Sequence, residues 1–176
     1  MNAGPGSLGG CFVHERHAHN FDLPRFAGWW GHNKSTRFNM RHGFDPIPGA
    51  EGWQLSNPPI LSLAAIKASL DIFEKVGMKK LNKKTKILTG YLEYLLDQIE
   101  GDRIRVITPR DPKQRGCQLS IQVKNADKSL FDRITEKGVI ADWREPDVIR
   151  VAPVPLYNSF EDVYRFVGIL KGEIEQ

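Results

Sequence analysis

The sequence predicts a compact α+β module from residue 57 to the C-terminus, preceded by 56 residues without a regular pattern. Two observations predict the module. Two long segments repeat apolar residues every three or four positions, and several short segments alternate apolar and polar residues. The first 56 residues are instead rich in Gly, His, Trp and Pro. The predicted order is two long helices followed by β-β-α-β-β-α.

Two long helices open the module. Ser56-Asn57-Pro58-Pro59 predicts the start of the first, because proline fits a first turn, where its missing N–H is not needed. This helix ends at Gly77, and its apolar face carries Leu61, Ala65, Ala68, Ile72 and Val76. The second helix runs from Met78 toward Gly101, and its apolar face carries Leu81, Thr85, Leu88, Leu92, Leu95 and Ile99.

Short elements complete the module. The predicted strands are Ile104–Ile107, Cys117–Val123, Val139–Trp143 and Val148–Val151. A short helix around Leu130, Phe131 and Ile134 ends at Gly138, between the second and third strands. Ser159 and Asp162 form a capping box that starts the last helix. The apolar face of this helix carries Val163, Val167, Leu170 and Ile174.

The first 56 residues contain one plausible strand, Cys11–His14. A single strand cannot satisfy its backbone polar groups, so it must pair with another. No partner is visible nearby in the sequence. We therefore expect its partner strands to lie outside this chain.

Composition narrows the function classes. The 176 residues are 40% hydrophobic and 26% charged, which is typical of a globular protein. The net charge of +4 is small and spread along the chain, so we expect neither nucleic acid nor a membrane as partner. No apolar run approaches the roughly 20 residues of a membrane span. Cys11 and Cys117 lack C-x-x-C partners, and we expect a cytoplasmic, reducing location without a disulfide framework.

Three strings resemble binding motifs but lack the required context. Gly4–Gly9 reads G-x-G-x-x-G, yet no strand precedes it, so a flexible turn is expected. The histidines of His14–His19 lack zincin spacing on a helix, which favours a surface or hydrogen-bonded cluster over a metal site. The lysines of Lys79–Lys86 lie largely opposite an apolar helix face and predict a solvated surface.

Adjacent tryptophans mark a candidate pocket. Trp29 and Trp30 lie between Gly28 and Gly31, and adjacent side chains on a helix or strand point in different directions. At least one is therefore expected in a pocket or interface, where an indole N–H can donate to a phosphate or carboxylate. A tryptophan pair in the core or in a subunit contact is the alternative.

Arg150 lies inside the apolar run 148–153. A buried guanidinium needs a partner, and its fork geometry suits a carboxylate. If Val148 faces the core, Arg150 shares that face. An ion pair within the protein is the alternative to a ligand carboxylate.

Eight strings in a fixed order cover essentially the whole chain. They are Asn2–Gly6, His14–His19, Gly28–His32, Ser35–Phe38, Ser56–Pro59, Leu88–Tyr94, Arg115–Leu119 and Ile149–Phe160. In this order they resemble kynureninase, a fold-type-I enzyme dependent on pyridoxal phosphate (PLP). The resemblance implies an α/β, PLP-dependent transferase-like fold. Residues 1–56 would be the remainder of the large PLP-binding domain, and residues 57–176 the small C-terminal α+β domain.

The resemblance also implies roles for three residues. The indole N–H of Trp29 would serve the cofactor phosphate, Asn57 would lie near the cofactor and the substrate ring, and Arg150 would bind the substrate α-carboxylate. Trp30 and His32 would help to line the pocket. The family's Schiff-base lysine would lie just upstream of Met1, so we expect no catalytic lysine in these residues and no PLP chemistry from them alone. No metal site is implied.

The implied reaction is hydrolysis of L-kynurenine or 3-hydroxy-L-kynurenine to anthranilate or 3-hydroxyanthranilate and L-alanine, in tryptophan catabolism and NAD biosynthesis. The family works as a homodimer with sites near the subunit interface. A non-catalytic carboxylate-binding or dimerisation module derived from a kynureninase is the alternative. Another PLP-dependent transferase fits the Trp-Trp-Gly-His and Ser-Asn-Pro-Pro strings poorly. We further expect uncovered apolar surface around Phe12, Val13, Trp29 and Trp30.

Overall fold

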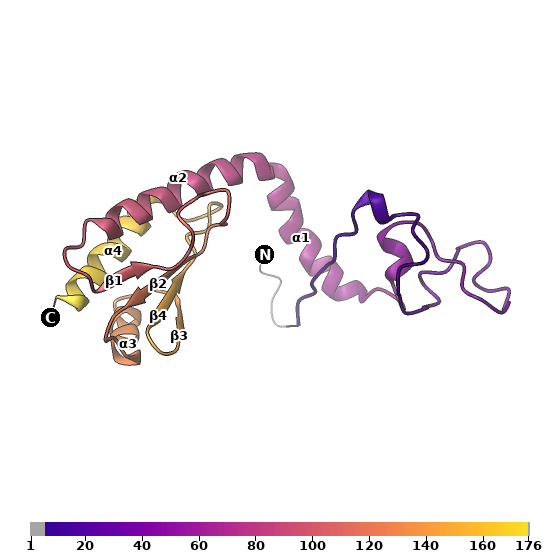
Figure 1. Cartoon of the computed structure of the whole chain (residues 1–176). Coiled ribbons are helices and arrows are strands. Elements are labelled where there is room, and N and C mark those ends of the chain that lie inside the picture. The colour runs from indigo at the N-terminus through magenta and orange to yellow at the C-terminus, as the bar shows by residue number, and fades with distance from the viewer. Residues whose placement is uncertain (1–5, 176) are drawn as a thin grey trace. The chain divides into compact units, whose positions relative to one another are not determined.

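The computed structural model describes residues 6–175, so the predicted turn at Gly4–Gly9 and the string Asn2–Gly6 lie partly outside the described residues. The chain divides into two compact units between Lys75 and Val76 (Figure 1). The boundary at residue 57 concerns the domains of a longer enzyme and stays a prediction.

The second unit is built on a four-stranded antiparallel sheet in the order β1-β2-β4-β3 (Figure 1). The strands are β1 (Ile104–Val106), β2 (Leu119–Val123), β3 (Asp142–Arg144) and β4 (Val148–Val151). The helices of this unit are α2 (Met78–Asp97), α3 (Lys128–Glu136) and α4 (Phe160–Ile174). The predicted order of elements is confirmed, as is the α+β character of this part of the chain.

Alternation along the central strands separates a core face from a polar face. Leu119, Ile121 and Val123 of β2 are buried, whereas the residues between them are half-buried. Ile149 and Val151 of β4 continue the core face. Leucines of α2, Ile134 of α3 and Leu170 of α4 pack against these side chains. Burial of this apolar surface is the main stabilising contribution in the unit.

Local signals fix the helix ends. Asp162 N donates to Ser159 Oγ over 3.1 Å, and Ser159 N donates to Asp162 Oδ2 over 2.8 Å, so the predicted capping box is confirmed. Gly138 has a φ of 87°, which lets the chain leave α3. Val139 N then bonds to Ile134 O, at the end of the helix. The prediction that β3 begins at Val139 is therefore wrong, because this backbone group completes the helix end instead of a strand ladder.

The first unit contains little regular structure. It holds two short 3₁₀ turns, η1 (Glu15–His17) and η2 (Ala50–Trp53), and the helix α1, Ile60–Val76, which extends to the boundary between the units. Cys11–His14 was predicted as a strand, and this is wrong: these residues join no ladder. Apolar character alone does not make a strand where no neighbouring strand is available for pairing.

Candidate functional site

Glycines allow the Trp-Trp segment to approach the chain that leads into α1. A Cβ added to Gly28 would lie 2.2 Å from Leu55 Cα, and one added to Gly31 would lie 2.9 Å from Gln54 O. Neither distance is available to a residue with a side chain, so glycine is required at both positions. Segment 28–31 therefore lies directly against segment 52–55.

The two tryptophans form an edge-to-face pair with an arginine beside them. Their ring centroids are 5.1 Å apart, and the Arg37 guanidinium carbon lies 5.7 Å from the Trp29 centroid. Arg37 Nη2 donates to Trp30 O and His32 O, which holds the loop. Trp29 is 43% exposed, and no hydrogen bond among residues 6–175 uses its indole N–H. This corner therefore offers a free N–H donor close to a positive charge.

Asn57 lies two residues after Leu55, against which Gly28 packs. Its side chain is exposed and, within the described part of the chain, makes no hydrogen bond. The close approach of segments 28–31 and 52–55 brings Trp29 and Asn57 to the same region of the first unit. Both side chains retain hydrogen-bonding capacity for a ligand.

His32 is held by its neighbours. Its Nδ1 accepts from Asp45 N over 3.2 Å, and its Nε2 lies 3.2 Å from Thr36 Oγ1. Because both ring nitrogens already have partners, the ring serves to hold the loop. Its predicted contribution to the pocket stays a prediction.

Arg150 belongs to the second unit and lies directly opposite Asp142 in the pairing of β3 with β4. Its Nε donates to Asp142 Oδ2 over 3.0 Å, and its Nη2 also donates to that oxygen. Arg144 Nη2 lies 2.9 Å from the same carboxylate. The hydrogen bond from Arg150, followed by the nearby charges of Arg144 and Arg150, holds the pKa of Asp142 below its usual range.

Arg150 lies on the polar face of the sheet. Ile149 and Val151 point into the core, so Val148 and Arg150 point the other way. The condition that Val148 faces the core is therefore not met. The Arg150 side chain is 33% exposed and carries the intraprotein ion pair considered as the alternative. Its Nη1, however, makes no hydrogen bond within residues 6–175.

Two cavities of about 350 Å³ lie away from these residues. The first is lined by Val151 to Pro153 and by α4 residues such as Phe166. The second lies between the end of α2 and β1. Trp29, Asn57 and Arg150 line neither, so we do not assign either cavity to the site.

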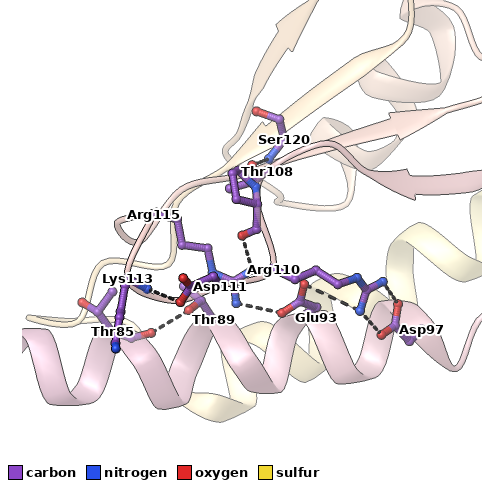
Figure 2. Close-up of polar contacts among 11 residues, drawn as sticks. Thr85, Thr89, Glu93, Asp97, Thr108, Arg110, Asp111, Lys113, Arg115 and Ser120 are labelled. Carbon is purple, nitrogen blue, oxygen red and sulfur yellow. Dashed lines mark hydrogen bonds and ion pairs between the residues drawn. The ribbon is translucent and has the colours of Figure 1, made fainter.

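A buried ion pair that sequence reasoning missed fixes the loop before β2 onto α2 (Figure 2). Arg115 Nη2 donates to Glu93 Oε2 over 2.7 Å, and the two side chains are 3% and 11% exposed. Arg110 pairs with Asp97 through two 2.7 Å hydrogen bonds nearer the end of the helix. Glu93 and Arg115 both fall in strings that carry the family resemblance, which was the available signal.

The remaining ionisable clusters show no metal-binding geometry. Within residues 6–175 no group of three His, Cys, Asp or Glu side chains converges as a metal site would require. In the His14–His19 string, Arg16 N donates to His14 Nδ1 and Arg16 Nε donates to His17 Nε2. None of the described helices is both long and apolar enough to cross a membrane.

Comparisons with solved structures show the fold. An apo cysteine desulfurase from Thermococcus onnurineus superposes with a TM-score of 0.68 at 16% identity, covering 93% of this chain and 42% of that one. A C-DES mutant with glycine covalently linked to its PLP cofactor gives a TM-score of 0.60 at 15% identity, covering 84% of this chain and 37% of that one. The predicted fold-type-I assignment is confirmed.

Sequence comparisons show the family. The kynureninase of Myxococcus xanthus is 58% identical over 176 residues, which is all of this chain and 41% of that protein. The chain therefore spans about two fifths of the length of this curated relative. The kynureninase C-terminal domain family matches residues 81–170, which contain most of the second unit and its entire sheet. The chain belongs to the kynureninase family, and these residues form the family's C-terminal domain.

Proposed function

We propose that this chain supplies substrate- and cofactor-binding residues to a kynureninase. The whole enzyme hydrolyses L-kynurenine or 3-hydroxy-L-kynurenine to anthranilate or 3-hydroxyanthranilate and L-alanine. Arg150 binds the substrate α-carboxylate, Trp29 donates to the cofactor phosphate, and Asn57 contacts the cofactor and the substrate ring. Family membership and the free donors of these three side chains support the proposal.

One observation carries the proposal: Arg150 presents an unpaired guanidinium nitrogen on the polar face of an otherwise rigid sheet. β4 is hydrogen-bonded on both sides, by β2 and by β3. A carboxylate bound there is held in a fixed orientation, which is a positioning contribution to catalysis.

The first unit fits the phosphate group of PLP. The Trp29 indole N–H is free and 43% exposed, and the Arg37 guanidinium beside it favours an anion. When bound, PLP supplies the electron sink for cleavage of the substrate carbon–carbon bond. The residues of this chain bind and orient the cofactor and the substrate, and the proton-carrying lysine belongs to a part of the enzyme other than these residues.

The proposal also covers the oligomeric state of the enzyme and its cellular location. The enzyme is a homodimer of the cytoplasm that acts in tryptophan catabolism and NAD biosynthesis. The uncovered apolar face of α1 supports an additional polypeptide surface packing against the first unit, since none of its residues is buried in this chain.

Activity can be tested by joining this chain to the preceding part of the Myxococcus xanthus kynureninase, which is 58% identical over the shared region. The joined enzyme, loaded with PLP, is assayed for release of anthranilate from L-kynurenine. We expect turnover, and a large rise in KM on Arg150→Ala. Arg105→Ala, an exposed arginine of β1 in the same sheet, is the matched control and should leave KM unchanged.

Failure takes two distinct forms. A joined enzyme that binds PLP, as its absorbance shows, but releases no anthranilate argues against the reaction. If the joined enzyme hydrolyses L-kynurenine and its Arg150→Ala variant has the same KM as the unmodified joined enzyme, the proposed reaction stands and the proposed role of Arg150 is wrong. If the joined enzyme binds L-kynurenine but does not hydrolyse it, and this binding is lost on Arg150→Ala, the carboxylate-binding module is favoured instead.

A further inference from the structure

Asp142 contacts only one edge of the Arg150 guanidinium. Both hydrogen bonds from Arg150, through Nε and Nη2, end on the same oxygen, Asp142 Oδ2. Nε and Nη2 form one side of the guanidinium fork, whereas Nη1 and the second hydrogen of Nη2 form the other. This second edge has no hydrogen-bond acceptor among residues 6–175.

The backbone fixes where this open edge points. Asp142 and Arg150 are paired across β3 and β4, so their Cβ atoms leave the same face of the sheet at adjacent positions. An arginine side chain without such a partner samples many rotamers, and ordering it on ligand binding costs free energy. The carboxylate of Asp142 removes much of this freedom before any ligand arrives.

The local charge still favours an anion. Asp142 lies within ion-pairing distance of two guanidinium groups, since Arg144 Nη2 is 2.9 Å from Oδ2 and Arg150 contacts the same oxygen. Two positive charges and one negative charge leave the cluster with one net positive charge. Asp142 therefore orders the arginines without neutralising the site, and its lowered pKa keeps it ionised.

We propose that Asp142 is a positioning residue, which fixes the Nε–Nη2 edge of Arg150 so that the Nη1–Nη2 edge receives the α-carboxylate of the substrate. This inference rests on the proposed carboxylate-binding role of Arg150. It adds a residue of β3 to the site and explains why the ion pair of Arg150 and its ligand role are compatible.

Electrostatics and positioning predict opposite results for loss of Asp142. If Asp142 acted only through its charge, or competed with the ligand for Arg150, its removal would tighten carboxylate binding. If it positions Arg150, its removal weakens binding although the site gains positive charge. The sign of the change in affinity therefore separates the two cases.

The test titrates L-kynurenine into the 176-residue chain and its variants, with NMR detection of the Arg150 Nε–Hε group. Asp142→Ala and Asp142→Asn are expected to raise the Kd about tenfold, the size of one good charge-assisted hydrogen bond. The Arg150 Nε–Hε signal, protected from exchange in the unmodified chain, should become fast-exchanging in Asp142→Ala. Asp147→Asn is the matched control, because Asp147 bonds to Gln122 and not to Arg150.

A second ligand separates positioning from general disruption of the fold. Kynuramine is kynurenine without the α-carboxylate, so loss of Asp142 should leave its affinity unchanged. An equal loss for both ligands would overturn the positioning role, as would an unchanged or lower Kd for L-kynurenine. If instead Arg150→Ala leaves binding of L-kynurenine intact, the proposed carboxylate role of Arg150 itself fails.

Discussion

Arg115 Nη2 and Glu93 Oε2 form a 2.7 Å ion pair that joins the loop before β2 to the C-terminal part of α2 (Figure 2). The Arg115 side chain is 3% exposed, and its Nη1 donates to Pro109 O over 3.1 Å. Arg115 thus makes one hydrogen bond within the loop, to Pro109 O, and one to α2, to Glu93 Oε2. The loop leads directly into β2, one of the two inner strands of the sheet.

Removing one partner of this pair should destabilise the second unit strongly. Glu93→Gln leaves a buried guanidinium without its counter-charge, and we expect a loss of about 3–5 kcal/mol in the free energy of unfolding. Urea unfolding followed by far-UV circular dichroism measures it. Asp97→Asn, which breaks the exposed pair with Arg110, is the matched control and should cost far less. Equal losses for the two variants would contradict a special role for burial.

Glu173 makes the stability of the second unit dependent on pH. Its side chain is 2% exposed, and hydrogen bonds from Lys137 and then Arg133 lower its pKa. Because the folded pKa lies below that of the unfolded chain, these pairs stabilise the fold above the usual carboxyl pKa of about 4.3. Their contribution is lost as the pH falls through the lowered folded value.

Urea unfolding at several pH values between about 7 and 3, a range that spans the usual carboxyl pKa, tests this pH dependence. Glu173→Gln should unfold more easily at neutral pH and lose less stability on acidification than the unmodified chain. Glu175→Gln removes an exposed carboxylate that lies 3.6 Å from Lys171, and its pH dependence should match that of the unmodified chain. Parallel curves for Glu173→Gln and the unmodified chain would disprove the assignment.

Local patterns predicted much of the second unit because its elements are specified locally. Val148–Val151 was predicted as a strand and is β4 with the same bounds. Alternation predicted the buried residues of β2, and the pairing of Ser159 with Asp162 predicted the start of α4. Each of these signals depends on residues within a few positions of one another.

Features set by contact between two separate elements were not predicted. The contact of Asp142 with Arg150 depends on the register of β3 and β4, and that of Glu93 with Arg115 on how a loop folds over a helix. The prediction of a strand at Cys11–His14 was wrong for the same reason, since a strand forms only with a partner strand. Periodicity identifies a face, but it does not say which residue of another segment meets it.

Gly28 should be intolerant of any side chain. An added Cβ would lie 2.2 Å from Leu55 Cα, so Gly28→Ala must push segment 28–31 away from segment 52–55. We expect a shift in tryptophan fluorescence and faster amide exchange in residues 28–37. Gly168→Ala is the matched control, because its Cβ meets open space in α4 and should stabilise that helix by about 0.5–1 kcal/mol. An unchanged fluorescence spectrum in Gly28→Ala would contradict the close approach.

The uncovered apolar face of α1 should make the isolated chain associate. Leu61 is 87% exposed and Ile72 is 54% exposed, although both lie on the apolar face that the sequence defines. Phe12 and Trp29 of the same unit are also exposed, at 86% and 43%. Apolar surface of this extent favours contact with other polypeptide over contact with water.

Sedimentation velocity at several protein concentrations measures this association. We expect the unmodified chain to form dimers or larger species, and the double variant Leu61→Gln, Ile72→Gln to shift toward monomer with unchanged helix content. Lys67→Gln, which removes an exposed charge from the same helix, is the control and should associate as the unmodified chain does. A monomeric unmodified chain that unfolds cooperatively would show that this unit needs no further polypeptide to cover it, and the expectation of a missing domain would then be wrong.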